Sequence, residues 1–244
     1  MPADLHRGPL PERPGRRTFL LAGAAALAAC AAQKPMGVAE SVEVPVPRWP
    51  VGRKWVYRRT DLYTKLAAGV LTREIVGRAD AGYHVVTRDE AGRVFDDARY
   101  SGPGRLLSGT LSQDGPVRGS FEPPLLIYDF TMVSGKTWSQ SFSRTDADGF
   151  RTAASVSTKV EGWETVTAGG REYPSIIIQR RYNLGPKDAF HGNSLRDELE
   201  WYAPELGGAA RLRISESYYE TLNSLGLPRP GARYLYELES FTAG

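Results

Sequence analysis

Cys30 is the only cysteine of the 244-residue chain, so it cannot form a disulfide within the chain. A free thiol in an oxidising compartment would be open to unwanted reaction. Leu27, Ala28 and Ala29 precede it, and their short or apolar side chains let a peptidase close on an extended backbone. The thiol is also the nucleophile that can carry a lipid. This local pattern therefore predicts covalent modification of Cys30.

An apolar segment leads up to this cysteine. Every residue from Phe19 and Leu20 through Ala29 is apolar or small. These eleven residues are too few to cross a bilayer as a helix, which needs about 20 residues, but they match the apolar part of a signal peptide. Together with Leu27-Ala28-Ala29-Cys30, the segment resembles a bacterial lipoprotein signal. The resemblance implies cleavage before Cys30 and a lipid on its thiol. An ordinary secretory signal or a retained N-terminal anchor is the alternative.

Two arginines stand directly before the apolar segment. The run Arg16-Arg17-Thr18-Phe19-Leu20 resembles the twin-arginine export motif, which implies transport of an already folded protein. Gly15 stands where that motif usually has Ser or Thr, and Leu21 stands where Lys is common. The alternative is a basic n-region of a Sec signal.

These signals divide the chain into three parts. Residues 1–29 are expected to form the signal peptide, 30–48 the lipid anchor with a proline-rich tether, and 49–244 the folded domain. Alternating prolines in the tether favour an extended backbone. Ala31 follows the cysteine, rather than the Asp that retains some lipoproteins at the inner membrane. We therefore expect a periplasm-facing protein at the outer membrane, where the source has one.

The charge of the chain gives no sign of nucleic-acid binding. The formal net charge is +3, and four arginines against two acids in residues 1–29 contribute +2 of it. The mature chain is thus close to neutral, without the basic surface that nucleic acids require. We expect the membrane, through Cys30, as the partner that the sequence itself indicates.

Beyond the cysteine, no spacing fits a metal or catalytic motif. His84 lies within an expected strand and His191 within a polar loop, and neither has a second ligand at metal-binding spacing. Asp146-x-Asp148-Gly149 begins like a calcium loop, but Arg151 and Ser157 stand where Gly and Glu are needed. We predict no cofactor, no metal and no catalytic residue, and keep an enzyme of unknown class as a third alternative.

A few charged residues could still form a site. The acidic pairs Asp96-Asp97 and Glu198/Glu200 could act together, but most β proteins contain such pairs, and we assign them no catalytic role. Arg180-Arg181-Tyr182, beside the expected polar loop 185–196, could bind an acidic group. A solvated strand end is the simpler interpretation.

From Trp49 onward the apolar residues alternate with a period of two, which predicts β-strands. Gly- and Asp-rich turns separate them, as in antiparallel sheets. One weak helical turn is expected around residues 218–225. The sequence thus predicts an all-β, mostly antiparallel domain, as a curled sheet or a half or open barrel. The expected strands cover residues 54–58, 70–76, 83–87, 93–95, 105–112, 125–130, 135–138, 154–163, 175–180, 197–202, 209–214 and 234–240.

The domain contains a possible internal repeat. Gly52-x-x-Trp55 and Gly135-x-x-Trp138 share a pattern at an offset of 83 residues, and each run continues to Arg-Thr-Asp. Duplicated halves, 49–130 and 131–244, would explain it, whereas two generic strand entries would also do so. In either case we expect Trp55 and Trp138 to be buried, structural side chains.

Several stretches carry a wider resemblance. Trp49-Pro50-Val51-Gly52-x-x-Trp55, the hairpin 162–178, Trp201-Tyr202-Ala203-Pro204 and the closing strand 236–240 resemble a broad group of uncharacterised bacterial envelope proteins. At fold level that group is similar to half-barrel periplasmic carriers of lipids or lipoproteins. The resemblance implies a structural role for Trp201, and a non-enzymatic function: binding or carrying an apolar ligand, or assisting envelope assembly. The alternative is a lipoprotein whose sheet edges dock a protein partner.

Overall fold

The computed structural model describes residues 42–79, 82–111, 118–186, 191–220 and 227–244. The predicted signal residues Arg16, Arg17, Phe19, Leu20, Leu27, Ala28 and Ala29, together with Cys30, lie outside the described residues. Within the described part, no helix has the length and apolar character to span a membrane.

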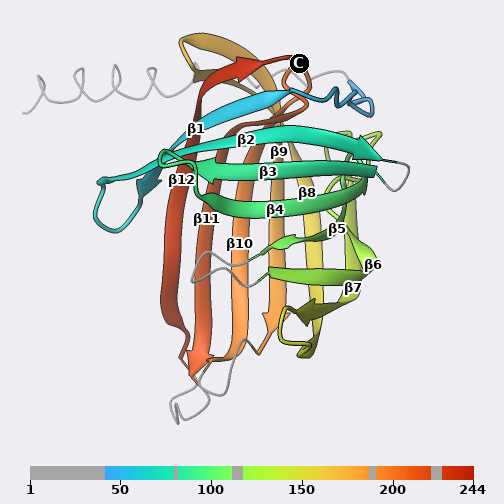
Figure 1. The fold of residues 1–244 in the computed structure, drawn as a ribbon, viewed down its shortest axis with the longest axis vertical. Coiled ribbons are helices and arrows are strands. Elements are labelled where there is room, and N and C mark those ends of the chain that lie inside the picture. Colours follow the sequence, from blue (N-terminus) through green and yellow to red (C-terminus); the bar gives the residue numbers. More distant parts are fainter. Residues whose placement is uncertain (1–41, 80–81, 112–117, 187–190, 221–226) are drawn as a thin grey trace, which may run out of the picture. The chain divides into compact units, whose positions relative to one another are not determined.

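Twelve antiparallel strands form one closed barrel (Figure 1). Each strand pairs with the next one along the chain, and β1 also pairs with β12, which closes the sheet. The prediction of an all-β, mostly antiparallel fold is confirmed. The strands are β1 (Lys54–Asp61), β2 (Ala67–Ala79), β3 (Gly82–Asp89), β4 (Val94–Gly102), β5 (Arg105–Thr110), β6 (Arg118–Leu126), β7 (Thr137–Asp146), β8 (Arg151–Ala168), β9 (Arg171–Gly185), β10 (His191–Ala203), β11 (Gly208–Glu220) and β12 (Arg229–Thr242).

Alternation along the strands decides which side chains fill the barrel. In β9, Ile176, Ile178, Arg180, Tyr182 and Leu184 are all buried, because successive side chains of a strand point to opposite faces. The residues between the last four of these, Gln179, Arg181 and Asn183 among them, are exposed and face solvent. The barrel interior is therefore built by apolar residues and by charged residues that share their phase.

Two sequence-based expectations about local structure were wrong. The polar loop expected over 185–196 is mostly strand, because β10 begins at His191 and pairs with both β9 and β11. The helical turn expected from residue 218 is also strand as far as Glu220, since Tyr218 pairs with Ser194 on one side and Arg229 on the other. In both places sheet pairing across the barrel overrides the local composition.

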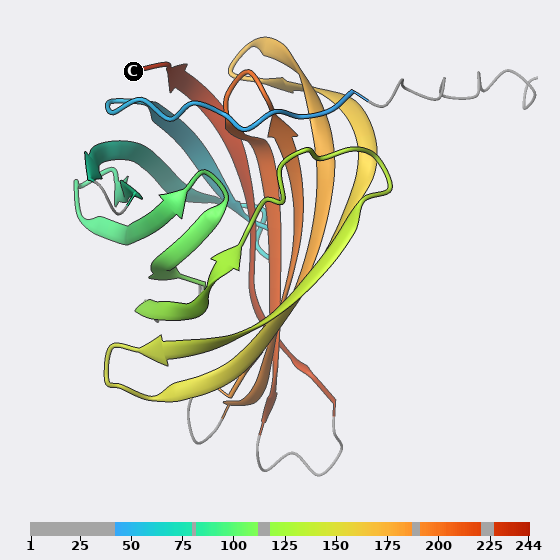
Figure 2. The ribbon, with the colours of Figure 1, turned by 90° about the vertical axis from the view of Figure 1, so that its right-hand side faces the viewer.

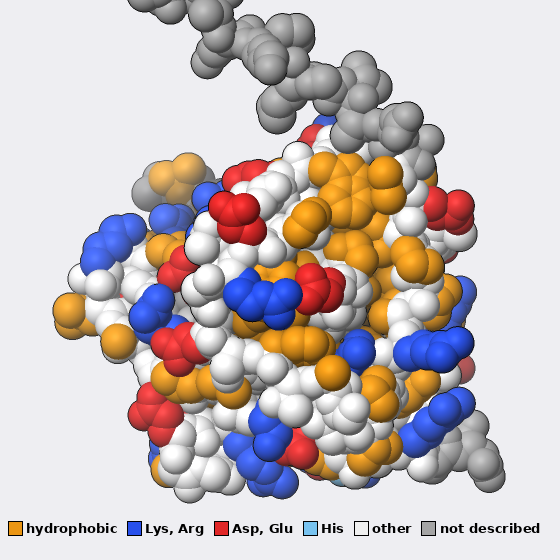
Figure 3. Space-filling model, turned by 90° about the horizontal axis from the view of Figure 1, so that it is seen from above, with side chains coloured by type: hydrophobic (Ala, Val, Ile, Leu, Met, Phe, Trp, Pro, Cys, Tyr) orange, Lys and Arg blue, Asp and Glu red, His pale blue; other side chains and the backbone are white. Residues whose placement is uncertain are grey.

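The chain before β1 covers one end of the barrel. Val44 forms an isolated bridge to Met132, with its amide donating to the Met132 carbonyl at 3.0 Å, and both side chains are fully buried beside Tyr202. Figure 2 shows this segment, in blue, crossing the upper end of the barrel. Seen from above, the same end presents apolar side chains among scattered charged ones (Figure 3). The last part of the expected tether, from residue 42, therefore packs onto the barrel.

Tryptophan side chains fix this end of the barrel. The indole of Trp49 donates to the Gly207 carbonyl at 3.1 Å, and that of Trp55 donates to the Leu206 carbonyl at 3.1 Å. Both rings are buried and meet edge to face, with centroids 6.4 Å apart. The β10–β11 turn is thus held against β1 and the segment before it by two hydrogen bonds over long sequence separations.

Candidate functional site

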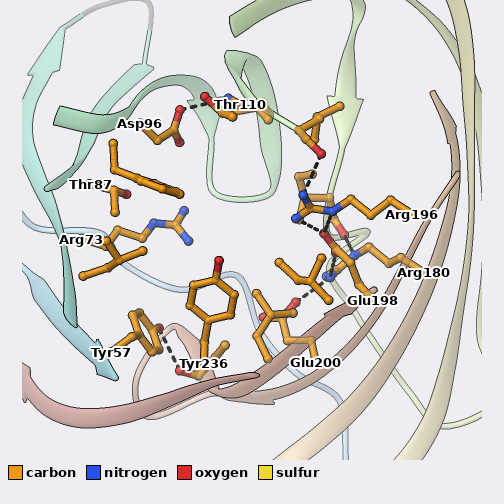
Figure 4. Close-up of a pocket in the computed structure, with 18 of the residues that line it drawn as sticks. Tyr57, Arg73, Thr87, Asp96, Thr110, Arg180, Arg196, Glu198, Glu200 and Tyr236 are labelled. Atoms are coloured by element: carbon orange, nitrogen blue, oxygen red, sulfur yellow. Dashed lines mark hydrogen bonds and ion pairs between the residues drawn. The ribbon is translucent and has the colours of Figure 1, made fainter. Parts of the chain in front are cut away.

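The barrel interior contains a cavity of about 190 Å³ (Figure 4). Most of its polar lining is charged or phenolic. The residues that line it are Tyr57, Leu71, Arg73, Thr87, Phe95, Asp96, Tyr100, Leu106, Thr110, Leu111, Ile127, Tyr128, Arg180, Tyr182, Arg196, Glu198, Glu200, Ala209, Leu212, Ile214 and Tyr236.

One wall of the cavity is a chain of buried ion pairs. Arg180 Nη1 lies 2.6 Å from Glu200 Oε2 and 3.2 Å from Glu198 Oε2. Arg196 Nη2 lies 2.6 Å from Glu198 Oε1, and its Nη1 lies 3.1 Å from Glu216 Oε1. All five side chains are buried. Figure 4 shows four of them, Arg180, Arg196, Glu198 and Glu200, on the same side of the cavity.

Strand register brings these charges together. The β9–β10 ladder places Arg180 opposite Glu198 and Tyr182 opposite Arg196, all on the inner face. Glu198 and Glu200 share that face because they are two residues apart in β10. The local sequence therefore places carboxylates and guanidiniums on the same face of their strands, and the pairing of neighbouring strands brings them into ion pairs.

The arginines determine the charge state of this wall. Burial acts to raise the pKa of Glu198, but Arg196 and Arg180 outweigh it and hold that pKa below its ordinary value. Tyr128 donates its hydroxyl proton to Glu200 Oε1 at 2.6 Å, and burial together with Glu200 raises the pKa of Tyr128 well above its ordinary value. The wall thus carries an ionised Glu198 carboxylate and a neutral Tyr128 phenol at neutral pH.

The opposite wall is a row across three strands. Arg73 of β2 is the register partner of Thr87 in β3, and Thr87 is the partner of Asp96 in β4. Arg73 Nη2 donates to the Tyr100 hydroxyl at 2.8 Å, and Asp96 Oδ1 accepts from the Thr110 amide at 2.9 Å. Burial raises the pKa of Asp96. Arg73 and Asp96 thus face the cavity from the same wall but do not form an ion pair with each other.

This lining is suited to binding a polar group. The described residues contain no cluster of three or more His, Cys, Asp or Glu side chains that could hold a metal ion. Among the described residues, the cavity lining includes no His, Cys or Ser. What it offers is guanidinium and phenol donors opposite carboxylate acceptors.

The residues singled out in the sequence take up different places. Trp55 is 2% exposed at the covered end, whereas Trp138 is half-buried and faces inward opposite Thr158. Trp201 is half-buried and lies on the outer face, where its indole donates to Glu164 Oε2 at 2.9 Å.

The adjacent charged residues that the sequence singled out, Asp96-Asp97 and Arg180-Arg181, lie on opposite faces of their strands. Asp96 faces the cavity, but Asp97 lies outside it and pairs with His84 Nε2 at 2.7 Å. Arg180 lies inside, while Arg181 is exposed. Adjacent residues of a strand cannot share a face, so neither pair acts as a unit.

Sequence reasoning missed Arg73, which gives the second wall its cation. A signal was present, since Leu71, Arg73 and Ile75 share one phase of β2, and the two aliphatic residues are buried. A charged residue in phase with core residues is unusual, because buried charge is costly without partners. The same signal marks Arg180 between Ile178 and Tyr182.

Comparison with known proteins shows resemblance at the level of structure. No protein-family model matches the chain, and neither does the sequence of any curated protein. A candidate lipoprotein from Parabacteroides distasonis is similar in structure, with a TM-score of 0.43 and 12% identity over 83% of this chain and 100% of its own. The hypothetical lipoprotein YmcC from Escherichia coli has a TM-score of 0.41 and 10% identity over 89% and 97%. An exported protein with a YmcC-like fold from Bacteroides fragilis has a TM-score of 0.39 and 14% identity over 82% and 100%. None of these names states an enzymatic activity.

Proposed function

We propose that this protein is a lipid-anchored envelope protein whose barrel is a binding module for a small polar ligand. The anchor part rests on the run Leu27-Ala28-Ala29-Cys30 and the apolar segment before it. In this proposal the chain is exported, cut before Cys30 and held by lipid on that residue. The barrel then stands on the periplasmic side, at the outer membrane where the source has one.

The observation that carries the binding role is the charged interior cavity. An apolar ligand, which the family resemblance implied, would place hydrocarbon against Arg73, whose guanidinium has no carboxylate partner among the described residues, and an unpaired buried charge is costly. The volume of about 190 Å³ also lies below the ~300–1,000 Å³ typical of sites for larger ligands. A small polar molecule fits both observations.

The partner-docking alternative loses its main argument in this fold. Addition of a strand needs an unpaired sheet edge, and in the closed barrel every strand has two neighbours. We therefore place the ligand inside the barrel rather than along its side.

The anchor is tested by Cys30→Ala. Lipidation contributes about 0.8 kcal/mol per buried CH₂, so loss of the thiol removes the anchor. We expect an unprocessed precursor or a protein released from membranes, whereas Ala31→Ser, which leaves the cysteine in place, behaves like the wild type. Membrane-bound Cys30→Ala protein at the wild-type mature mass would contradict the proposal.

The export route is tested by the double change Arg16→Lys and Arg17→Lys. A receptor that reads two planar guanidiniums does not accept ammonium groups of equal charge. We expect the double variant to remain in the cytoplasm as precursor. Normal export of this variant would instead assign the protein to the Sec route.

The ligand chamber is tested by native mass spectrometry of the full processed protein extracted in detergent. We expect a mass excess that disappears on denaturation. Thr87→Phe, which projects a ring into the cavity, should lose it, and Thr72→Phe, on the outer face of the neighbouring strand, should keep it. Absence of any mass excess from the wild type, or equal retention by both variants, argues against a ligand in this chamber.

A further inference from the structure

We infer that Arg73 is the receptor for one oxyanion group, a carboxylate, phosphate or sulfate, held in the barrel cavity. The inference rests on the proposed ligand chamber and specifies which chemistry it takes. Arg73 is enclosed by the barrel wall, yet it keeps accessible surface, and that surface lines the cavity. Figure 4 shows its guanidinium pointing toward the centre of the cavity.

Arg73 differs from the other arginines inside the barrel. Arg180 and Arg196 each contact two carboxylates, and Arg144 contacts Asp146 at 2.7 Å. Across the described ranges, no carboxylate lies within 4.0 Å of the Arg73 guanidinium, although several acids line the same cavity. Arg73 is thus an interior cation for which the described residues supply no ion-pair partner.

The register explains why Asp96 does not serve as that partner. Asp96 and Arg73 are two strands apart, with Thr87 between them, which separates their backbones by about 9.6 Å at ~4.8 Å per strand. The Thr110 amide also holds Asp96 Oδ1 at 2.9 Å. Asp96 is therefore anchored on β4 and β5 rather than turned toward the guanidinium.

The lack of an acidic partner for Arg73 has a physical consequence. Guanidinium stays protonated inside proteins, and a buried charge without a partner is unfavourable. The adjacent cavity is the place where a counter-ion can enter. Its volume of about 190 Å³ admits a carboxylate, phosphate or sulfate group.

The donors around Arg73 match the geometry of an oxyanion. Guanidinium presents five N–H donors in a planar fork, and the Tyr100 hydroxyl takes one of them at 2.8 Å. Having accepted that bond, the Tyr100 oxygen still carries its own proton as a donor. Trp55 and Tyr100 rings lie 5.8 Å from the guanidinium carbon and fix its plane. Arg73 and Tyr100 together can therefore bind one anion through several hydrogen bonds.

Acidic side chains elsewhere in the cavity lining limit the ligand to one such group. Asp96 and Glu200 face the same space, so a second anionic group would meet carboxylates. Hydroxyl or amino groups on the ligand would instead donate to these acids. The ligand class is thus a small molecule with one oxyanion and further hydrogen-bond donors.

The inference is tested by calorimetric titration and thermal melts of the full processed protein with acetate, inorganic phosphate and sulfate. Chloride at equal ionic strength is the baseline, because sulfate and phosphate stabilise proteins generally. We expect at least one of the three anions to bind the wild type and to bind Arg73→Met at least tenfold more weakly. Arg88→Met, an exposed arginine on β3, should bind like the wild type. Arg73→Lys, which keeps the charge but not the fork, should bind with intermediate affinity.

Folding of the key variant is checked in chloride, where Arg73→Met should melt at or above the wild-type temperature because it removes an unpaired charge. Equal anion affinity of Arg73→Met and the wild type would overturn the inference. If no anion binds but native mass spectrometry still shows a mass excess that Thr87→Phe removes, the ligand chamber is supported and the oxyanion assignment is wrong. If neither anion binding nor the mass excess is detected, both the oxyanion assignment and the proposed binding function are wrong.

Discussion

Gly52 and Gly135 hold the same turn at two places in the barrel. Their φ values are +86° and +83°, which favour glycine. The Gly52 amide donates to the Ile75 carbonyl at 2.8 Å, and the Gly135 amide donates to the Val160 carbonyl at 2.8 Å. Both acceptor residues are fully buried. The shared Gly-x-x-Trp pattern of the sequence thus corresponds to a shared backbone arrangement.

The likeness continues into the strands. The β2 register shifts between Ile75 and Gly77, and the β8 register shifts between Val160 and Gly162. Strands β1–β6 lie between the first turn and the second, and strands β7–β12 follow the second. These matches are consistent with the hypothesis that residues 49–130 and 131–244 are duplicated halves, which the sequence left open beside two generic strand entries.

Replacing either turn glycine with alanine should destabilise the barrel. A side chain at positive φ costs roughly 1–2 kcal/mol, and Gly52→Ala and Gly135→Ala meet no severe contact that would add to it. We expect the two variants to lose similar amounts of stability in urea unfolding. Gly102→Ala, at a strand glycine without positive φ and with open space, is the control and should be neutral or slightly stabilising. A large difference between Gly52→Ala and Gly135→Ala would contradict the equivalence of the turns.

The buried and exposed ion pairs should respond very differently to truncation. Glu198→Ala leaves Arg180 and Arg196 short of a carboxylate inside the barrel, which should cost about 3–5 kcal/mol. Asp197→Ala removes the neighbouring acid, whose 2.8 Å contact with Arg181 is solvent-exposed, and should cost at most about 1 kcal/mol. Denaturant unfolding of both variants measures the difference. Equal losses would show that the interior network does not behave as buried charge.

Stability should fall in acid because of the same network. Burial alone would raise the pKa of Glu198, yet Arg196 and Arg180 depress it below the unfolded value of about 4.3. A depressed carboxyl pKa contributes stability above the unfolded pKa, and this contribution is lost as pH falls through the folded value. Denaturation midpoints measured from neutral pH down to about pH 3 should therefore drop. Glu198→Gln should flatten this dependence, and an unchanged slope would exclude Glu198 as its source.

The two tryptophans of the repeated pattern should differ in their structural importance. Trp55 is 2% exposed and bonded to Leu206, so Trp55→Ala should cost about 3–5 kcal/mol. Trp138 is half-buried and its indole nitrogen has no partner within the described structure, so Trp138→Ala should cost less. Thermal melts of the two variants compare them directly. A Trp55→Ala protein that melts like the wild type would mean that this ring is not part of the core.

Local sequence already determined the strands and the faces of their side chains. Alternation of Ile176, Ile178, Arg180 and Tyr182 is a property of one strand, and it places all four on one face whatever the strand pairs with. The Asp146–Gly149 turn likewise follows from local residue preferences, with the Gly149 amide donating to the Asp146 carbonyl at 2.9 Å. Such features depend on contacts within a few residues, so sequence reasoning could reach them.

Closure of the barrel and the character of its cavity depended on the tertiary structure. The pairing of β1 with β12 joins residues nearly the whole domain apart, and no local pattern states that register. The same holds for the site. Arg180 meets Glu200 because β9 and β10 align, whereas Arg73 faces open space because Thr87 separates it from Asp96. The sequence alone identifies arginines in phase with core residues, but whether such a charge is neutralised or left available to a ligand is decided by the strands beside it.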